Sequence, residues 1–139
     1  MGCTSRPLKG LTLEGKRAYL GPAPIDHTEA YQTFLLGSRS EAEKLYYLLN
    51  RVKEAKDVTY RFDDGVYTHF EAYPAALWLL VHHYERGEKA RDFVHKEFLA
   101  FRGLSESTTM HFPDGSYHLA YYVFLNELDL LEETLEDSN

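Results

Sequence analysis

The chain has 139 residues, a hydrophobic fraction of 44% and a formal net charge of −7, from 15 basic and 22 acidic residues. This length is typical of one domain with one core, and the composition excludes a disordered polymer. The acidic balance, without a stripe of Lys and Arg, argues against nucleic acid as a partner. No stretch of the sequence is long and apolar enough to cross a bilayer as a helix.

The N-terminal stretch "MGCTSRPLKG" places the only cysteine, Cys3, directly after a glycine. A Gly-Cys pair is typical of the end of a bacterial lipoprotein signal, although the apolar region that precedes such a site is missing. Two alternatives stay open: myristoylation of Gly2, which favours Ser or Thr where the chain has Arg6, and an unmodified thiol. We expect lipidation of Cys3 and, if a signal has been removed, a periplasmic protein held at a membrane only through this anchor.

Residues 1–25 are rich in Gly and Pro and are predicted to be a flexible tether. Residues 26–139 are predicted to form a single, mainly α domain, a compact bundle of about four helices with a small two-stranded β element. A short helix is expected near the start of this domain, with Asp26 as its N-cap and Gly37 as its terminator.

The segment 41–56 is predicted to be a long helix, because Ser40 begins a capping box and leucines recur at helical spacing. The next stretch, "DVTYRF", is β-branched and aromatic, which predicts a short strand. Asp64 and Gly65 tolerate the backbone of a tight turn after that strand.

Thr68 and Glu71 form a second capping box, which predicts a helix that Pro74 bends or delays. Gly87 separates this helix from another, which is expected to end near Gly103. The following linker is rich in hydroxyl groups and contains a second short strand at 110–112.

Residues 119–135 are predicted to be the last helix, since the run "LAYYVFL" also suits a buried strand but the length of the pattern favours a helix. One core is expected, built by the four long helices. Its predicted members are Leu45, Leu49, Val52, Leu77, Leu80, Phe93, Val94, Phe98, Leu125 and Leu128.

Two stretches, "RFDDGVY" and "HFPDGSY", share the pattern Phe-x-Asp-Gly-x-Tyr, beginning at Phe62 and Phe112. Their flanking sequences differ, which favours repeated turn chemistry over a duplicated binding element. We therefore expect positive φ angles at Gly65 and Gly115, and we expect pairing of the two strands to bring both turns together.

The motifs "KDVTYRFDDG", "KARDFVHKE", "SEST" and "FLNEL" resemble, in this order, the YfeK-like family of small exported bacterial proteins of unknown function. The resemblance covers about Ser40 to Leu131. It implies export and a compact, mostly helical domain, and it supplies no reaction. The chain departs from the family pattern at an inserted Asp63, at Pro74 and at the absence of a histidine early in the second helix, so no site built on that histidine is carried over.

In that family an aromatic residue, Arg and Asn-Gly stand where this chain has Tyr60, Arg61 and Asp64-Gly65, and Lys96 occupies the matching helix position. The second Phe-x-Asp-Gly-x-Tyr stretch contributes the equivalent pair of an acidic and an aromatic residue, Asp114 and Tyr117. The candidate binding residues are therefore Tyr60, Arg61, Asp64, Tyr67, Lys96, Asp114 and Tyr117.

The chain has seven histidines, and His82-Glu85 and Asp92-His95 have the spacing that places two ligands on one helix face. A zinc site needs three or four converging donors, and neither HExxH nor a cysteine set is present. The sequence also lacks GxSxG, Walker and GxGxxG motifs, so we expect no catalytic residues, no metal and no cofactor.

These patterns favour a non-enzymatic, lipoprotein-like envelope domain that binds a protein or an envelope component. The many tyrosines that one core stripe does not accommodate support this interpretation. The alternative is a small metal-binding or hydrolytic enzyme that uses His, Asp and Glu residues.

Overall fold

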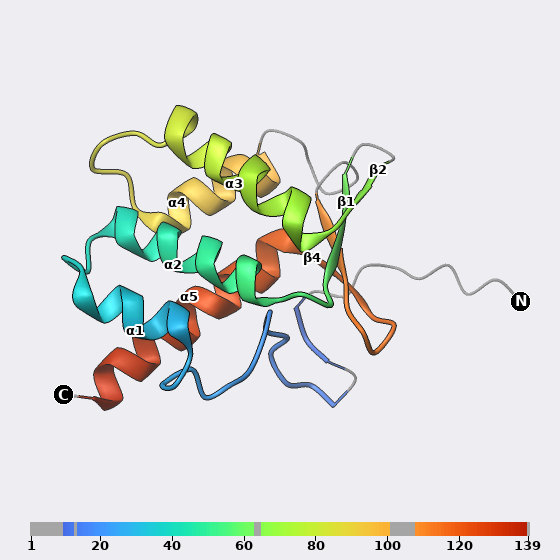
Figure 1. Cartoon of the computed structure of the whole chain (residues 1–139), viewed down its shortest axis with the longest axis horizontal. Coiled ribbons are helices and arrows are strands. Elements are labelled where there is room, and N and C mark those ends of the chain that lie inside the picture. The colour runs from blue at the N-terminus through green and yellow to red at the C-terminus, as the bar shows by residue number, and fades with distance from the viewer. Residues whose placement is uncertain (1–9, 13, 63–64, 101–107, 139) are drawn as a thin grey trace, which may run out of the picture.

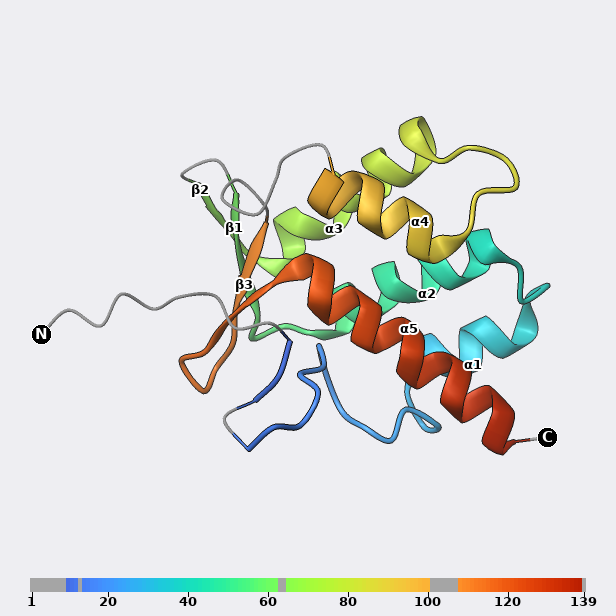
Figure 2. The same cartoon turned by 180° about the vertical axis from the view of Figure 1, so that it is seen from behind.

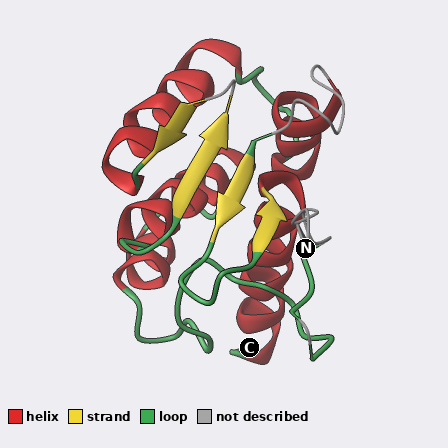
Figure 3. Ribbon diagram, turned by 90° about the vertical axis from the view of Figure 1, so that its right-hand side faces the viewer, coloured by secondary structure: helices red, strands yellow, loops and turns green. Residues whose placement is uncertain are grey.

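The computed structural model describes residues 10–12, 14–62, 65–100 and 108–138, and its helices lie on one side of a small sheet (Figures 1 and 3). The α-helices of this part are α1 (Glu29–Leu36), α2 (Glu41–Glu54), α3 (His69–His83), α4 (Ala90–His95) and α5 (Ala120–Asp137); α4 continues into a π-helical segment, η1 (Lys96–Ala100). The strands are β1 (Thr59–Phe62), β2 (Gly65–Tyr67), β3 (Thr109–His111) and β4 (Tyr117–Leu119). A mainly α fold with a small sheet is confirmed, but the sheet has four strands and the prediction of two was wrong.

The sheet is antiparallel throughout and has the strand order β2-β1-β3-β4. One row of aligned residues crosses it from Tyr67 through Tyr60 and Met110 to His118. The last three of these are buried, so this row faces the helices. Because β1 and β3 run antiparallel, the turns that follow them lie at opposite ends of the sheet, and the expectation that pairing would join the turns was wrong.

Local capping signals define where the longer helices begin. The side chain of Ser40 accepts a hydrogen bond from the Glu43 N–H at the start of α2, and Thr68 and Glu71 form the predicted capping box of α3. Helix α3 continues through Pro74 without a break. The N-cap of α1 is Thr28, which accepts from the Tyr31 N–H, so the prediction of Asp26 was wrong.

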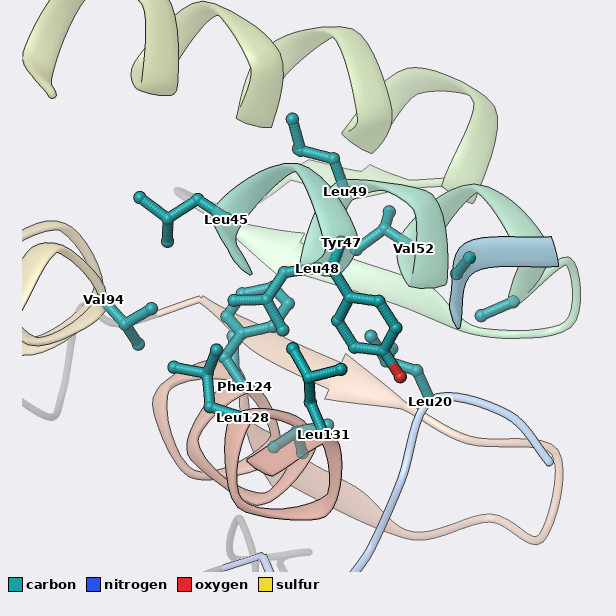
Figure 4. Packing of buried hydrophobic residues seen from close by; sticks show 14 of the residues in the cluster. Leu20, Leu45, Tyr47, Leu48, Leu49, Val52, Val94, Phe124, Leu128 and Leu131 are labelled. Atoms are coloured by element: carbon teal, nitrogen blue, oxygen red, sulfur yellow. The ribbon is translucent and has the colours of Figure 1, made fainter. Parts of the chain in front are cut away.

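Helix α2 lies at the centre of the helical layer and contacts α1, α3, α4 and α5. Seen from behind, α5 runs along this layer beside α2 and α4 (Figure 2). Figure 4 shows Leu48 and Tyr47 directed toward α5, whereas Leu49 lies on the side of α3. Of the predicted core residues, seven are buried (Leu45, Leu49, Val52, Leu80, Phe93, Val94 and Leu128), and Leu77, Phe98 and Leu125 pack partly buried against them.

The described part of the N-terminal segment packs on the helices, which differs from the flexible tether expected for residues 1–25. Leu20 and Ile25 are buried members of the core, and the Leu20 N–H donates to Glu127 Oε2 at 2.7 Å. Glu127 also forms an ion pair with Arg51, between Oε1 and Nε at 2.7 Å, and both side chains are fully buried. The described residues of this segment, 10–12 and 14–25, therefore differ from a flexible tether, and residues 1–9 and 13 lie outside the described part.

Candidate functional site

An apolar cleft of about 560 Å³ opens between α3, the helix-facing side of β1 and β2, and η1. This volume lies within the usual range of small-molecule sites, about 300–1,000 Å³. A second cavity, of about 30 Å³, lies between α2, α3 and α4 and has room for little more than one water molecule. The residues that line the larger cleft are Val52, Tyr60, Phe62, Tyr67, Glu71, Ala72, Ala75, Ala76, Trp78, Leu79, Glu97, Phe98, Thr108 and Phe124.

Small side chains on one face of α3 explain why this space is not filled. Ala72, Ala75, Ala76 and Leu79 follow the spacing i, i+3, i+4 and i+7, which places them on one side of a helix. Three alanines on this face do not reach across to the aromatic side chains of the sheet. The cleft is therefore a consequence of the α3 sequence.

Helix α3 is apolar on its outer face as well. Phe70, Trp78 and Val81 are 80%, 53% and 62% exposed, and only Leu80 of this 15-residue helix is fully buried. Most soluble helices pair an apolar face with a polar one. A helix that exposes large apolar side chains on its outer face is typical of an interaction surface.

The sheet contributes three aromatic side chains to the cleft. Tyr60 and Phe62 alternate onto the helix-facing side of β1, and Tyr67 of β2 is aligned with Tyr60. Tyr60 is buried, and its hydroxyl has no hydrogen-bond partner within the described ranges. Burial, and then the charge of Glu127, raise the pKa of Tyr60 above the ordinary value of a phenol, so the hydroxyl keeps its proton.

Glu97 lies on the opposite wall, in the π-helical segment η1, and is only 6% exposed. Its Oε1 is 2.8 Å from Nδ1 of His83, whereas its buried Oε2 has no hydrogen-bond partner among the residues that the structure describes. Single-turn π-helical segments occur frequently at functional sites. A buried carboxylate with one unpartnered oxygen needs an explanation, since such a group costs free energy.

Aromatic rings and imidazoles cluster at the end of α3 nearest Glu97. The Trp78 ring stacks on His82 with a centroid distance of 4.3 Å and meets the edge of His83 at 5.3 Å. His83 is half-exposed while its partner Glu97 is buried. The hydrogen bond between His83 and Glu97 therefore connects the solvent-exposed end of α3 to the wall of the cleft.

The structure brings two of the seven predicted binding residues, Tyr60 and Tyr67, into the cleft. Arg61 points to the other side of the sheet, because successive residues of a strand alternate between its faces. Tyr117 lies on that same outer face, where its ring stacks on His111 at 4.4 Å. Lys96 precedes Glu97, but its ammonium group binds Glu88 at 3.0 Å and the His83 carbonyl at 2.9 Å, outside the lining of the cleft.

The remaining predicted residues do not contribute to the cleft that the structure describes. Asp114 accepts hydrogen bonds from the hydroxyl and the N–H of Ser116, which lower the pKa of Asp114, so it stabilises the turn between β3 and β4. Asp64 and Cys3 lie outside the described residues. Glu97, Trp78 and Phe98 were missed as site residues, although the alanine face of α3 is a signal in the sequence.

The histidines do not gather into a metal site in the part of the chain that is described. There, no group of three or more His, Cys, Asp or Glu residues has an arrangement that could hold a metal ion. His118, on β4, is buried with an unpartnered Nδ1, and burial lowers the pKa of its imidazole. This histidine faces the core, beside the ring of Phe112, and belongs to the packing of the sheet.

Among the described residues, no helix combines the length and the apolar character that a membrane-spanning segment requires. Comparisons of the chain with protein-family models, curated proteins and solved structures found no match.

Proposed function

We propose that this chain is a non-enzymatic binding domain of the bacterial cell envelope, and that it holds an apolar group of a protein or an envelope component in the cleft between α3 and the sheet. The observation that carries this proposal is the cleft itself, about 560 Å³ of space with mostly aliphatic and aromatic walls. An empty space of this kind destabilises the protein, because the residues of its walls lose dispersion contacts and expose apolar surface to water. A ligand that fills the cleft restores those contacts and removes that surface from water.

The exposed apolar residues of α3 are evidence that the ligand is part of a larger partner. Phe70, Trp78 and Val81 extend the apolar surface from the cleft to the outside of the helix. Three large exposed apolar side chains on one helix favour an interaction site. A partner that inserts one apolar group into the cleft would cover this helix at the same time.

A neutral hydrocarbon probe, 1,6-diphenylhexatriene, tests the cleft without assuming any charge on the ligand. Trp78 is the only tryptophan of the chain and lines the cleft, so it reports binding by energy transfer to the probe. We expect saturable binding to the wild-type protein. Ala75→Phe should weaken binding at least tenfold, because Ala75 lines the cleft and is exposed enough to accept a larger side chain.

The matched control is Thr33→Phe, which adds the same ring at an exposed position of α1, away from the cleft. It should bind the probe as the wild type does. Absence of saturable binding to the wild type, or equal binding by both variants, would contradict the proposal.

The location in the envelope is proposed from the sequence, through the Gly-Cys pair at Cys3 and the resemblance to exported YfeK-like proteins. An acylated Cys3 would hold the domain at a membrane surface, since each buried CH₂ contributes about 0.8 kcal/mol. Intact mass of the native gene product from the membranes of its host tests this point. A free, alkylatable thiol in a soluble fraction would refute it and leave the cleft proposal untouched.

The alternative, a small hydrolytic or metal-binding enzyme, rests on the His83–Glu97 pair. A carboxylate bonded to Nδ1 fixes the orientation of an imidazole, as general-base catalysis requires. Within the described ranges this pair has no third donor to complete a metal site, so the enzyme is the second candidate. Zinc binding that is lost in His83→Ala would favour it.

A further inference from the structure

We infer that the ligand of the cleft is an apolar amine, an ammonium group carried on an alkyl or aryl chain. This inference rests on the proposed function of the cleft as a binding site and specifies the chemical class of its ligand. Three properties of the walls lead to it: their charge, one unsatisfied carboxylate oxygen, and their aromatic composition.

Among the described residues that line the cleft, the two charged side chains are acidic, Glu71 and Glu97, and none is Lys or Arg. The nearest basic residue along the chain, Lys96, binds Glu88 and the His83 carbonyl. Among the described lining residues, no Lys or Arg offsets the charge of Glu97, and the imidazole of His83 bonds its Oε1 from outside the lining. A cleft with this charge pattern attracts a cation and repels an anion.

Glu97 provides the position for the cationic group. Its Oε1 is taken by His83, and Oε2 is buried with no hydrogen-bond partner in the part of the chain that the structure describes. An ionised carboxylate only accepts hydrogen bonds, so Oε2 lacks a donor. An ammonium group placed against Glu97 supplies three donors and a neutralising charge, which removes the cost of a buried, half-satisfied carboxylate.

Aromatic rings make up much of the remaining wall: Tyr60, Phe62, Tyr67, Trp78, Phe98 and Phe124. The faces of such rings attract cations, and their surfaces bury an attached hydrocarbon chain. The alanine face of α3 leaves room for that chain. Neither a fatty acid nor a neutral lipid matches all three properties, because the first is repelled by the carboxylates and the second leaves Glu97 unpaired.

The test compares three ligands of one chain length at pH 7.5: octylammonium, octanol and octanoate, each below its micellar concentration. Binding is measured by the fluorescence of Trp78 and by calorimetry. Octylammonium should bind at least tenfold more tightly than octanol, which corresponds to about 1.4 kcal/mol. Octanoate should bind most weakly.

Glu97→Gln should abolish the preference, so that octylammonium and octanol bind with equal affinity. Glu136→Gln is the matched control, since it removes the same charge from an exposed position near the end of α5 and should keep the preference. If Glu97→Gln does not fold, Tyr67→Leu replaces it. Tyr67 lies in β2, at the edge of the sheet, and its ring can attract a cation. The substitution should weaken the binding of octylammonium, while the affinity for octanol should stay within about twofold of the wild-type value.

Equal binding of octylammonium and octanol by the wild type would overturn the amine inference while leaving the cleft as a binding site. An equal loss of preference in Glu136→Gln would overturn it too, because general charge attraction would then explain the preference. Failure of all three ligands and of diphenylhexatriene would instead remove the proposed function.

Discussion

Buried polar residues of this protein differ in whether their hydrogen bonds are complete. Arg51 and Glu127 are joined by two bonds, at 2.7 and 3.0 Å, and Glu127 also accepts the Leu20 N–H. Burial alone would lower the pKa of Arg51, but the hydrogen bond and charge of Glu127 outweigh it, so the pKa of Arg51 is raised and its guanidinium stays charged. Glu97 and Tyr60, by contrast, each leave one buried atom without a partner among the described residues, and both line the cleft. Unpartnered buried atoms occur elsewhere as well, at Tyr47, Glu54, His69 and His118, so it is the position of Glu97 and Tyr60 in the cleft that makes these two candidates for contact with a ligand.

His118 predicts how stability depends on pH. Because burial lowers the pKa of this imidazole in the folded protein, the unfolded chain binds more protons near pH 6. The contribution of His118 to stability is therefore complete above about pH 6.5 and is lost as the pH falls below that value. In His118→Asn, the melting temperature should fall less between pH 7.5 and pH 5.0 than it does in the wild type.

Thermal melts followed by circular dichroism measure this difference, with the exposed His82→Asn on α3 as control. The control should show the wild-type pH dependence. A pH dependence that is the same in all three proteins would show that His118 does not titrate as its burial requires.

At the scale of elements, the sequence predicted those whose signals are local. Capping-box patterns at Ser40 and Thr68 predicted the starts of α2 and α3, because their residues are three positions apart; the full box forms at Thr68, and at Ser40 only the Glu43 N–H is bonded. Strands β2 and β4 were missed, although β3 is equally short, because each leads directly into a helix whose own pattern is stronger than that of three residues. Their pairing depends on partners elsewhere in the chain.

The two Asp-Gly stretches show that a short sequence pattern does not by itself determine the backbone conformation. Gly115 has the predicted positive φ, at 89°. Gly65 does not, because it lies within β2 and pairs with Phe62. The shared pattern Phe-x-Asp-Gly-x-Tyr therefore places its glycine in two different backbone conformations.

Alanine substitutions should separate these two glycines. Gly115→Ala is expected to cost about 1–2 kcal/mol, since an L side chain is strained at this φ. Gly65→Ala should cost less, because its new Cβ would meet only the movable end of the Tyr67 side chain, with the hydroxyl at 2.7 Å. Urea denaturation measures both, and a larger loss for Gly65→Ala would contradict this assignment.

At the scale of the whole molecule, the mainly α fold and most of the core could be predicted because helical periodicity marks the buried face of each helix. The Arg51–Glu127 pair could not, since its members are 76 positions apart and the N-terminal segment that it fixes has no periodicity of its own. Gly and Pro content predicted a tether where Leu20 and Ile25 are in fact buried.

The candidate site was predicted only in part, because its residues come from elements that are far apart in the sequence. Tyr60 and Tyr67 come from one hairpin, and the sequence identified both. The cleft, however, exists only because the alanine face of α3 and Glu97 of η1 meet that hairpin in space. Residues from separate elements carry no shared pattern along the chain, so their convergence requires the structure.

The most direct test of the cleft as the binding site is a set of intermolecular NOEs between isotopically labelled protein and unlabelled octanol. Octanol is neutral, so the result does not depend on the charge of Glu97. The account predicts contacts from the methyl end of octanol to ring protons of Tyr67, Trp78 and Phe98, which line the cleft on three different elements. Contacts confined to other exposed apolar residues, such as Leu36 and Tyr46, or no contacts at saturating octanol, would contradict it.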